Sequence, residues 1–178
     1  MILVLGFWSF MNKTFTYIKR FFVIEVILTG LISLGALIVC PLMAYRGVLP
    51  PVMIMLAIAA FYQVWNTFIA IANPEKVTIT DDSIIFSCWG REDKYPFSEL
   101  AEFRVREFPT AGKMYIRINN HNLFHGRYWL QTNQMTDGKE LFRLICDMEY
   151  QIHPDTIKAR ARRINTEYLE NEKNKNTK

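Results

Sequence analysis

The sequence predicts a transmembrane α-hairpin followed by an α+β domain, in which a bent antiparallel sheet or partly open barrel is capped by a C-terminal helix. Two apolar runs, residues 21–45 and 48–72, are separated only by Arg46 and Gly47. An alternation of apolar and polar residues begins near residue 76, and a helical periodicity replaces it after residue 137. Alternation is typical of half-buried strands, and apolar residues at i, i+3, i+4 and i+7 are typical of an amphipathic helix.

Both apolar runs are long enough to cross a bilayer, whose hydrocarbon core of about 30 Å needs about 20 apolar helical residues. The first run carries one charge, Glu25, and the second carries none. Because Glu25 lies one turn inside the membrane edge, we expect its side chain to reach Lys19 or the lipid headgroups. Lysines and arginines gather at the outer ends of the two runs, whereas the loop between the runs holds only Arg46. This distribution predicts a multi-pass protein of the inner (plasma) membrane with both termini in the cytoplasm.

The hairpin also carries small and polar residues, and its short loop forces the helices antiparallel. Residues equally far from the loop therefore lie at the same depth, which places the polar residues of the two helices opposite one another. Buried hydroxyls and amides seek partners where water is absent. We expect these residues to pack the helices together, or alternatively to contact an oligomer or another protein: Thr29, Ser33, Gln63, Asn66 and Thr67.

Four segments follow from these patterns: an interfacial N-terminal segment (1–20), the transmembrane hairpin (21–73), a cytoplasmic domain (74–152), and a basic helix with a disordered tail (153–178). The first segment has its apolar stretch, residues 1–11, ahead of its positive residues Lys13, Lys19 and Arg20, which is the reverse of a signal peptide. We expect its aromatic residues at headgroup depth: Phe7, Trp8, Phe10, Phe15 and Tyr17.

The three cysteines, Cys40, Cys88 and Cys146, are far apart in sequence, which favours buried thiols in a reducing compartment.

Strands are predicted for most of residues 77–132, with turns at residues 81–83, 89–93 and 109–112. Asp137 with Glu140 three residues later has the spacing of a helix capping box. The helix that follows places its apolar residues on one face, where they can close the open side of the sheet: Leu141, Leu144, Ile145 and Met148.

Three segments follow one another in a fixed order: residues 77–84 (VTITDDSI), 95–100 (YPFSEL) and 137–141 (DGKEL). On these segments, residues 76–150 resemble the bacterial pleckstrin-homology-like (bPH) domain. The resemblance implies a bent barrel capped by a helix, often placed directly after transmembrane helices, with a binding or scaffolding role. Eukaryotic relatives that bind inositides place basic residues in the first hairpin loop. Here we expect that loop to be residues 81–83, where Asp81 and Asp82 would repel a phosphate.

A row of outward basic residues on two neighbouring strands is the candidate binding surface: Arg104, Arg106, Lys113 and Arg117. These cations suit anionic headgroups or an acidic partner, although a plain solvated sheet face has the same composition. Net charge is +4, and the tail adds a basic amphipathic helix that suits a membrane surface or a docking partner, or is simply solvated: Lys158, Arg162 and Arg163. Trp89, beside a turn, is a further candidate for the membrane interface.

The sequence contains no phosphate-binding loop, nucleophile elbow or zinc-protease motif. His121 and His125 lie four residues apart in a loop, but no acid or cysteine nearby completes a metal site. We expect no enzymatic activity, cofactor or metal. We expect a membrane-anchored binding or scaffold module that contacts membrane lipid and a partner protein or a second copy of itself, with no nucleic acid. The alternative is an accessory subunit of a membrane transporter or enzyme, docked through the polar face of the hairpin.

Overall fold

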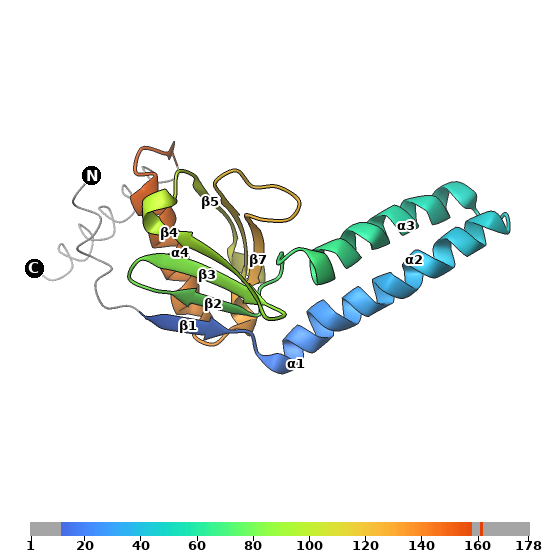
Figure 1. Ribbon diagram of the computed structural model, residues 1–178, viewed down its shortest axis with the longest axis horizontal. Coiled ribbons are helices and arrows are strands. Elements are labelled where there is room, and N and C mark those ends of the chain that lie inside the picture. Colours follow the sequence, from blue (N-terminus) through green and yellow to red (C-terminus); the bar gives the residue numbers. More distant parts are fainter. Residues whose placement is uncertain (1–11, 158–160, 162–178) are drawn as a thin grey trace, which may run out of the picture.

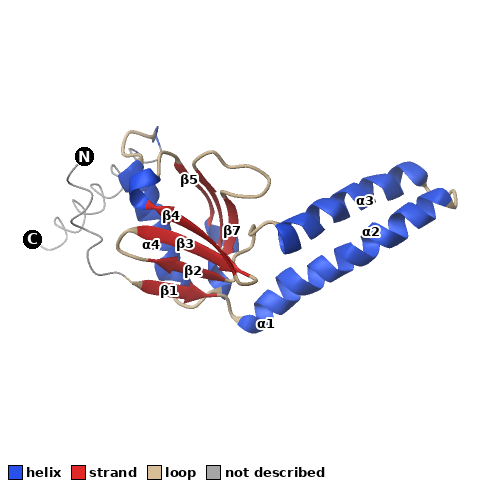
Figure 2. Cartoon of the chain, viewed as in Figure 1, coloured by secondary structure: helices blue, strands red, loops and turns tan. Residues whose placement is uncertain are grey.

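The computed structural model describes residues 12–157 and 161 of the 178-residue chain. A helical hairpin projects from a domain built of two antiparallel sheets and one long helix (Figure 1). The helices of the hairpin stand clear of the domain along most of their length (Figure 2).

The hairpin consists of two helices joined by a tight turn. Its first arm is continuous from α1 (Lys19–Phe22) through the π-helical segment η1 (Val23–Leu28) into α2 (Thr29–Tyr45). Its second arm is α3 (Pro50–Val64) followed by the π-helical segment η2 (Trp65–Ile69). The arms, of 27 and 20 residues, are long and apolar enough to cross a membrane. Gly47 (φ +82°) makes the turn, and Pro50 begins α3 where a missing backbone N–H leaves no hydrogen bond unmade.

Within residues 12–157 the domain contains seven strands in two sheets. The first sheet consists of β1 (Lys13–Thr16), β2 (Lys76–Ile79), β3 (Ser83–Cys88) and β4 (Arg91–Pro96), which lie side by side in that order. The second sheet consists of β5 (Phe103–Phe108), β6 (Lys113–Ile118) and β7 (Arg127–Gln131), again in that order. Short 3₁₀ turns lie at Phe97–Glu99 (η3), Pro109–Ala111 (η4) and Thr132–Gln134 (η5). Among the described residues the two sheets are not joined by strand pairing, so they form no closed barrel.

Strand β1 lies before the hairpin in the chain and pairs with β2 after it, with Phe15 opposite Val77. The hairpin is thus an insertion between two neighbouring strands of one sheet (Figure 1). Phe15 is fully buried and Tyr17 is 4% exposed, so the expected headgroup-level position of these two side chains is wrong. Phe7, Trp8 and Phe10 lie outside the described residues. The loop between the first two strands is accordingly the hairpin itself, not residues 81–83.

The C-terminal helix α4 (Gly138–Ile152) packs its predicted apolar face into the core between the sheets, and Leu141, Ile145 and Met148 are buried. The predicted capping box does not form. Asp137 has a left-handed backbone (φ +48°) and no capping hydrogen bond from its side chain, while Glu140 forms an ion pair with Lys13. Cys40, Cys88 and Cys146 are buried free thiols, as predicted.

Candidate functional site

The outward face of the β5–β7 sheet gathers cations and aromatic rings. Side chains that alternate with the buried core positions of these strands point to this face, which we call the cationic face: Arg104, Arg106, Phe108, Lys113, Tyr115, Arg117, Arg127, Trp129 and Gln131. These nine positions of the three strands include five cations, three aromatic residues and no carboxylate. The face can therefore attract an anion and also offer apolar contact beside it.

Three arginines stand directly opposite one another across the sheet. Arg104 pairs with Arg117, and Arg117 pairs with Arg127; we call these the arginine row. Like charges placed directly opposite destabilise a sheet. Glu102, which precedes β5, forms an ion pair with Arg104 at 2.6 Å, at one end of the row. Among the described residues, neither Arg117 nor Arg127 has an ion pair that would offset this repulsion.

The aromatic residues of the cationic face lie together beside the row. The Tyr115 and Trp129 rings are 4.6 Å apart between centroids, and the Phe108 and Trp129 rings are stacked with their centroids 6.0 Å apart. The Arg117 guanidinium lies over the Tyr115 ring, 5.8 Å from its centroid. Contact with a ring orders a guanidinium without using its hydrogen-bond donors, so those donors stay available to a ligand.

The β7 side of the cationic face adjoins the end of the hairpin. The backbone N–H of Trp129 donates to the backbone carbonyl of Ala72 at 2.7 Å. This hydrogen bond joins the outer edge of β7 to the chain that leaves the second helix. A narrow crevice between the two parts is lined by residues of both, including Tyr62, Asn66, Tyr115, Arg127 and Trp129. The cationic face therefore begins where the apolar helices end.

The loop between β6 and β7 contacts the same end of the hairpin. The Trp65 indole N–H donates to the Leu123 carbonyl at 3.2 Å, and the Trp65 ring contacts Phe124 edge-on at 4.9 Å. Leu123 and Phe124 nevertheless remain about half exposed, at 53% and 50%. The loop thus holds two apolar side chains at the level where the hairpin enters the domain.

A groove of about 860 Å³ runs along the opposite, β5 side of the cationic face. Its walls include Arg104, Arg106 and Arg117. Edge strand β5 is covered here, because its Phe103 and Val105 N–H groups donate to His153 Nε2 (3.0 Å) and Glu149 Oε1 (2.7 Å). These caps block the addition of another strand at this edge. His153 therefore has a structural role at this edge.

Glu25 connects the first helix of the hairpin to the domain. Its carboxylate accepts hydrogen bonds from the Gln134 side-chain amide and, at 3.4 Å, from the Tyr17 hydroxyl. Tyr17 also donates to the Gln134 side-chain oxygen at 2.6 Å. Burial, with the neighbouring Glu25 charge, raises the pKa of Tyr17 well above its ordinary value. The expectation that Glu25 reaches Lys19 or the headgroups is wrong, because its carboxylate accepts hydrogen bonds from Gln134 and Tyr17 instead.

The turn between β3 and β4 holds the end of the second helix. The Trp89 indole N–H donates to the Thr67 carbonyl at 3.1 Å, and Arg91 donates to the carbonyls of Phe68 and Ile69. These bonds satisfy carbonyls that a helix end leaves without partners. The Trp89 ring also contacts Phe22 of the first helix, so this turn joins both arms.

A polar network closes the gap between the two sheets near the loop that precedes β7. The Tyr128 hydroxyl donates to Asp93 Oδ2 at 2.7 Å and lies 2.6 Å from the Tyr95 hydroxyl, while His125 Nδ1 lies 3.4 Å from Asp93 Oδ1. Burial, together with these hydrogen bonds, raises the pKa of Tyr128 strongly. The network connects strand β4 of one sheet to strand β7 of the other. The described residues hold no cluster of His, Cys, Asp and Glu able to bind a metal ion.

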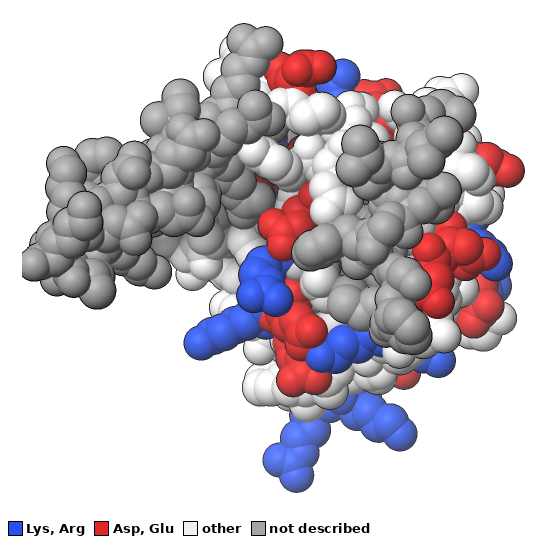
Figure 3. All heavy atoms as spheres, turned by 90° about the vertical axis from the view of Figure 1, so that its left-hand side faces the viewer, with Lys and Arg blue, Asp and Glu red and all other residues white. Residues whose placement is uncertain are grey.

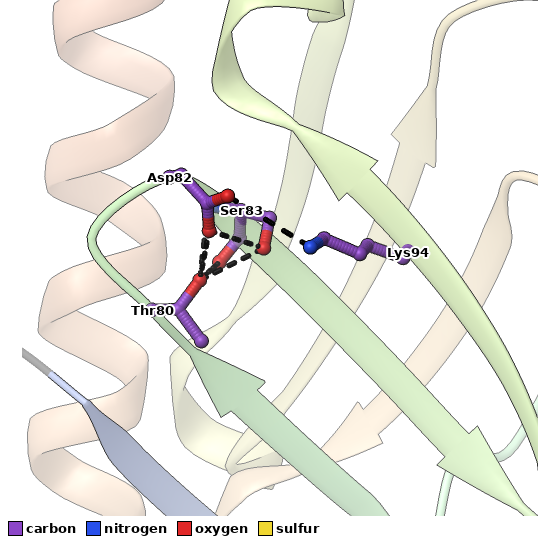
Figure 4. Close-up of polar contacts among 4 residues, drawn as sticks. All are labelled: Thr80, Asp82, Ser83 and Lys94. Atoms are coloured by element: carbon purple, nitrogen blue, oxygen red, sulfur yellow. Dashed lines mark hydrogen bonds and ion pairs between the residues drawn. The ribbon is translucent and has the colours of Figure 1, made fainter.

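The turn between β2 and β3 lies at the end of the domain away from the hairpin (Figure 1). Asp82 accepts hydrogen bonds from Thr80 and Ser83 at 2.7 and 2.9 Å, and Lys94 lies 3.8 Å away (Figure 4). These hydrogen bonds lower the pKa of Asp82. The same end of the domain shows positive and negative side chains intermixed (Figure 3). The single-sign surface therefore lies elsewhere, on the cationic face.

The structure brings together all four described residues of the predicted basic row: Arg104, Arg106, Lys113 and Arg117. It adds Arg127, which sequence reasoning missed because its place beside Arg117 depends on the register of β7. Lys158, Arg162 and Arg163 lie outside the described residues. A binding role for the basic row and for these three residues stays a prediction.

The polar residues of the hairpin form hydrogen bonds mostly within their own helix. Thr29 donates to backbone carbonyls one turn earlier, Ser33 donates to the Thr29 carbonyl, and Gln63 lies 3.5 Å from the Thr67 hydroxyl. The arms approach each other closely at Gly30, where an added Cβ would come within 2.7 Å of the Thr67 methyl group. Asn66 lines the crevice beside the domain.

No protein-family model matches this chain, and no solved structure matches it.

Proposed function

We propose that this chain is a membrane-anchored, non-enzymatic binding module. Its hairpin spans the bilayer with both termini in the cytoplasm, and its domain, which we propose to be PH-like, works at the cytoplasmic surface. There the domain engages the membrane surface or a partner protein.

The observation that carries this proposal is the way the hairpin is built into the domain. It leaves the sheet at β1 and returns at β2, and the Glu25, Trp89 and Arg91 contacts hold both arms at their base. A hairpin inserted in this way would hold one fixed side of the domain against the surface of the bilayer that the hairpin spans. A flexible linker would leave every side of the domain equally available.

The exposure of the hairpin supports a lipid environment. Only 17% and 11% of the most apolar stretches of the two arms are buried, whereas the core helix of a soluble domain would be mostly buried. Water-exposed apolar surface of this extent is costly in a soluble monomer. Aromatic and basic side chains gather at the base of the hairpin, as they do where membrane helices meet the headgroups: Lys19, Arg20, Trp65, Trp89 and Arg91.

Fractionation and native purification test the proposal together. Membranes from cells that express the full-length chain are washed with alkaline carbonate, and the chain is then extracted with mild detergent. We expect it to stay in the washed membranes and to be extracted with a stoichiometric protein partner, a second copy or retained lipid. Recovery in the supernatant without detergent would contradict the anchor, and a bare monomer without protein or lipid would contradict the binding role.

A further inference from the structure

The cationic face meets the hairpin at the level where, under the proposed function, the bilayer surface lies. Arg127 and Trp129 line the crevice beside Tyr62 and Asn66 of the second helix. Neighbouring strands are about 4.8 Å apart, so the whole arginine row lies within about 10 Å of the β7 strand that adjoins the hairpin. Arginine side chains are long enough to reach across that distance to a headgroup beside the helices.

The arrangement of the row is unfavourable for the isolated domain. Arg117 has an arginine directly opposite on each side, and only Arg104, at the end of the row, has a described ion pair. An anion bound over the row would remove this repulsion, and phosphate suits it because guanidinium groups bind phosphate oxygens in pairs. The repulsion thus favours a bound phosphate over a merely solvated face.

We propose that the cationic face binds the phosphate headgroup of an anionic phospholipid, held by the arginine row beside the hairpin. This inference rests on the proposed function, since it requires the hairpin to lie in a bilayer. Tyr115 and Trp129 lie beside the row at the depth where aromatic side chains contact the glycerol region. Exposed Leu123 and Phe124 extend the apolar contact from the neighbouring loop.

A phospholipid fits the position of this face better than a nucleic acid does. Cations interleaved with aromatic rings also suit single-stranded nucleic acid. However, the face adjoins helices whose apolar side chains are exposed along their length, and that position brings phospholipid headgroups to it without any other partner. A nucleic acid would have to approach a surface that the bilayer itself partly covers.

Native mass spectrometry of the full-length chain in detergent tests this assignment. The chain is mixed with equal amounts of phosphatidylglycerol and phosphatidylcholine, and the two lipid-bound populations are compared. The test variant is Arg117→Gln/Arg127→Gln, and the matched control is Lys94→Gln/Arg143→Gln, which removes two cations from β4 and α4. Each cation near an anionic lipid surface strengthens binding about fivefold. We therefore expect the preference for phosphatidylglycerol to fall about fivefold for each arginine removed, and to persist in the control.

A preference that is unchanged in the test variant, or reduced equally in the control, would overturn the assignment. So would tight binding of a short oligothymidylate at physiological salt without any preference for phosphatidylglycerol. If the double variant misfolds, Arg127→Gln alone carries the same test. A chain that stays in carbonate-washed membranes but has no lipid preference refutes this inference alone. A chain found in the supernatant refutes the proposed function as well.

Discussion

The contact between Glu25 and Gln134 gives the sharpest test of how the hairpin is joined to the domain. Gln134 donates to the Glu25 carboxylate, and the only other described donor, the Tyr17 hydroxyl, lies at the long distance of 3.4 Å. A hydrogen bond to a charged group contributes about 1.5–3 kcal/mol to stability. We therefore expect Gln134→Leu to destabilise the folded chain by about 2 kcal/mol.

A double-mutant cycle separates this contact from general effects of the substitution. The free energy of unfolding is measured in mixed micelles for the wild type, Gln134→Leu, Glu25→Leu and the double variant. The cycle is measured in a Tyr17→Phe background, because the Tyr17 hydroxyl would otherwise lose both of its acceptors in the double variant. Removing both Glu25 and Gln134 then leaves no carboxylate without a donor, so the double variant should recover at least 1 kcal/mol of the summed losses. Gln131→Leu, at a half-buried outward position of β7, serves as the control and should change stability little. Additive losses in the cycle would refute the proposed connection.

Three further predictions concern other contacts. Gly30→Ala should destabilise the hairpin by about 1–3 kcal/mol, because the added methyl group overlaps the opposing helix; Gly35→Ala, which meets open space, should be neutral or stabilising in the same thermal unfolding assay. Burial raises the pKa of the Cys88 thiol from 9.0 to about 11. The unfolded thiol therefore loses its proton first as pH rises, and stability should fall by about 2 kcal/mol between pH 8 and 11. Cys88→Val should flatten this part of the pH profile, and an unchanged slope would contradict the assignment. Glu149→Ala should cost about 1–3 kcal/mol by leaving the Val105 N–H without this acceptor, and hydrogen exchange should become faster at that amide; equal protection would count against the cap.

The elements that the sequence predicts well are those whose pattern is local. The apolar arms, strands β2, β3, β5, β6 and β7 and helix α4 each show their own periodicity over enough residues to be recognised. Strand β4 does not, because its residues do not alternate, and it begins at Arg91, inside the turn predicted for residues 89–93. Strand β1 does not, because it has only four residues and directly precedes a long apolar run. Its partner lies some 60 residues further along the chain, across the inserted hairpin.

The details of the candidate sites depend on contacts that sequence spacing does not reveal. Gln134 reaches Glu25 across 109 residues, which no local pattern signals. Arg127 joins the arginine row only through the register that the preceding loop imposes on β7. The capping-box spacing at Asp137 was misleading, because the chain enters α4 there with a left-handed backbone. Sequence thus predicts which face is basic, but not which cations stand in direct opposition.

Thiol labelling in intact cells tests most directly whether the hairpin crosses the bilayer with the domain in the cytoplasm. Single cysteines are introduced at Gly47 in the hairpin loop and at Asp82 in the turn at the far end of the domain, with the native cysteines replaced by alanine. We expect a membrane-impermeant reagent to label the Gly47 position in intact cells and the Asp82 position only after permeabilisation. Labelling of the Asp82 position in intact cells, or no labelling of the Gly47 position, would contradict this expectation.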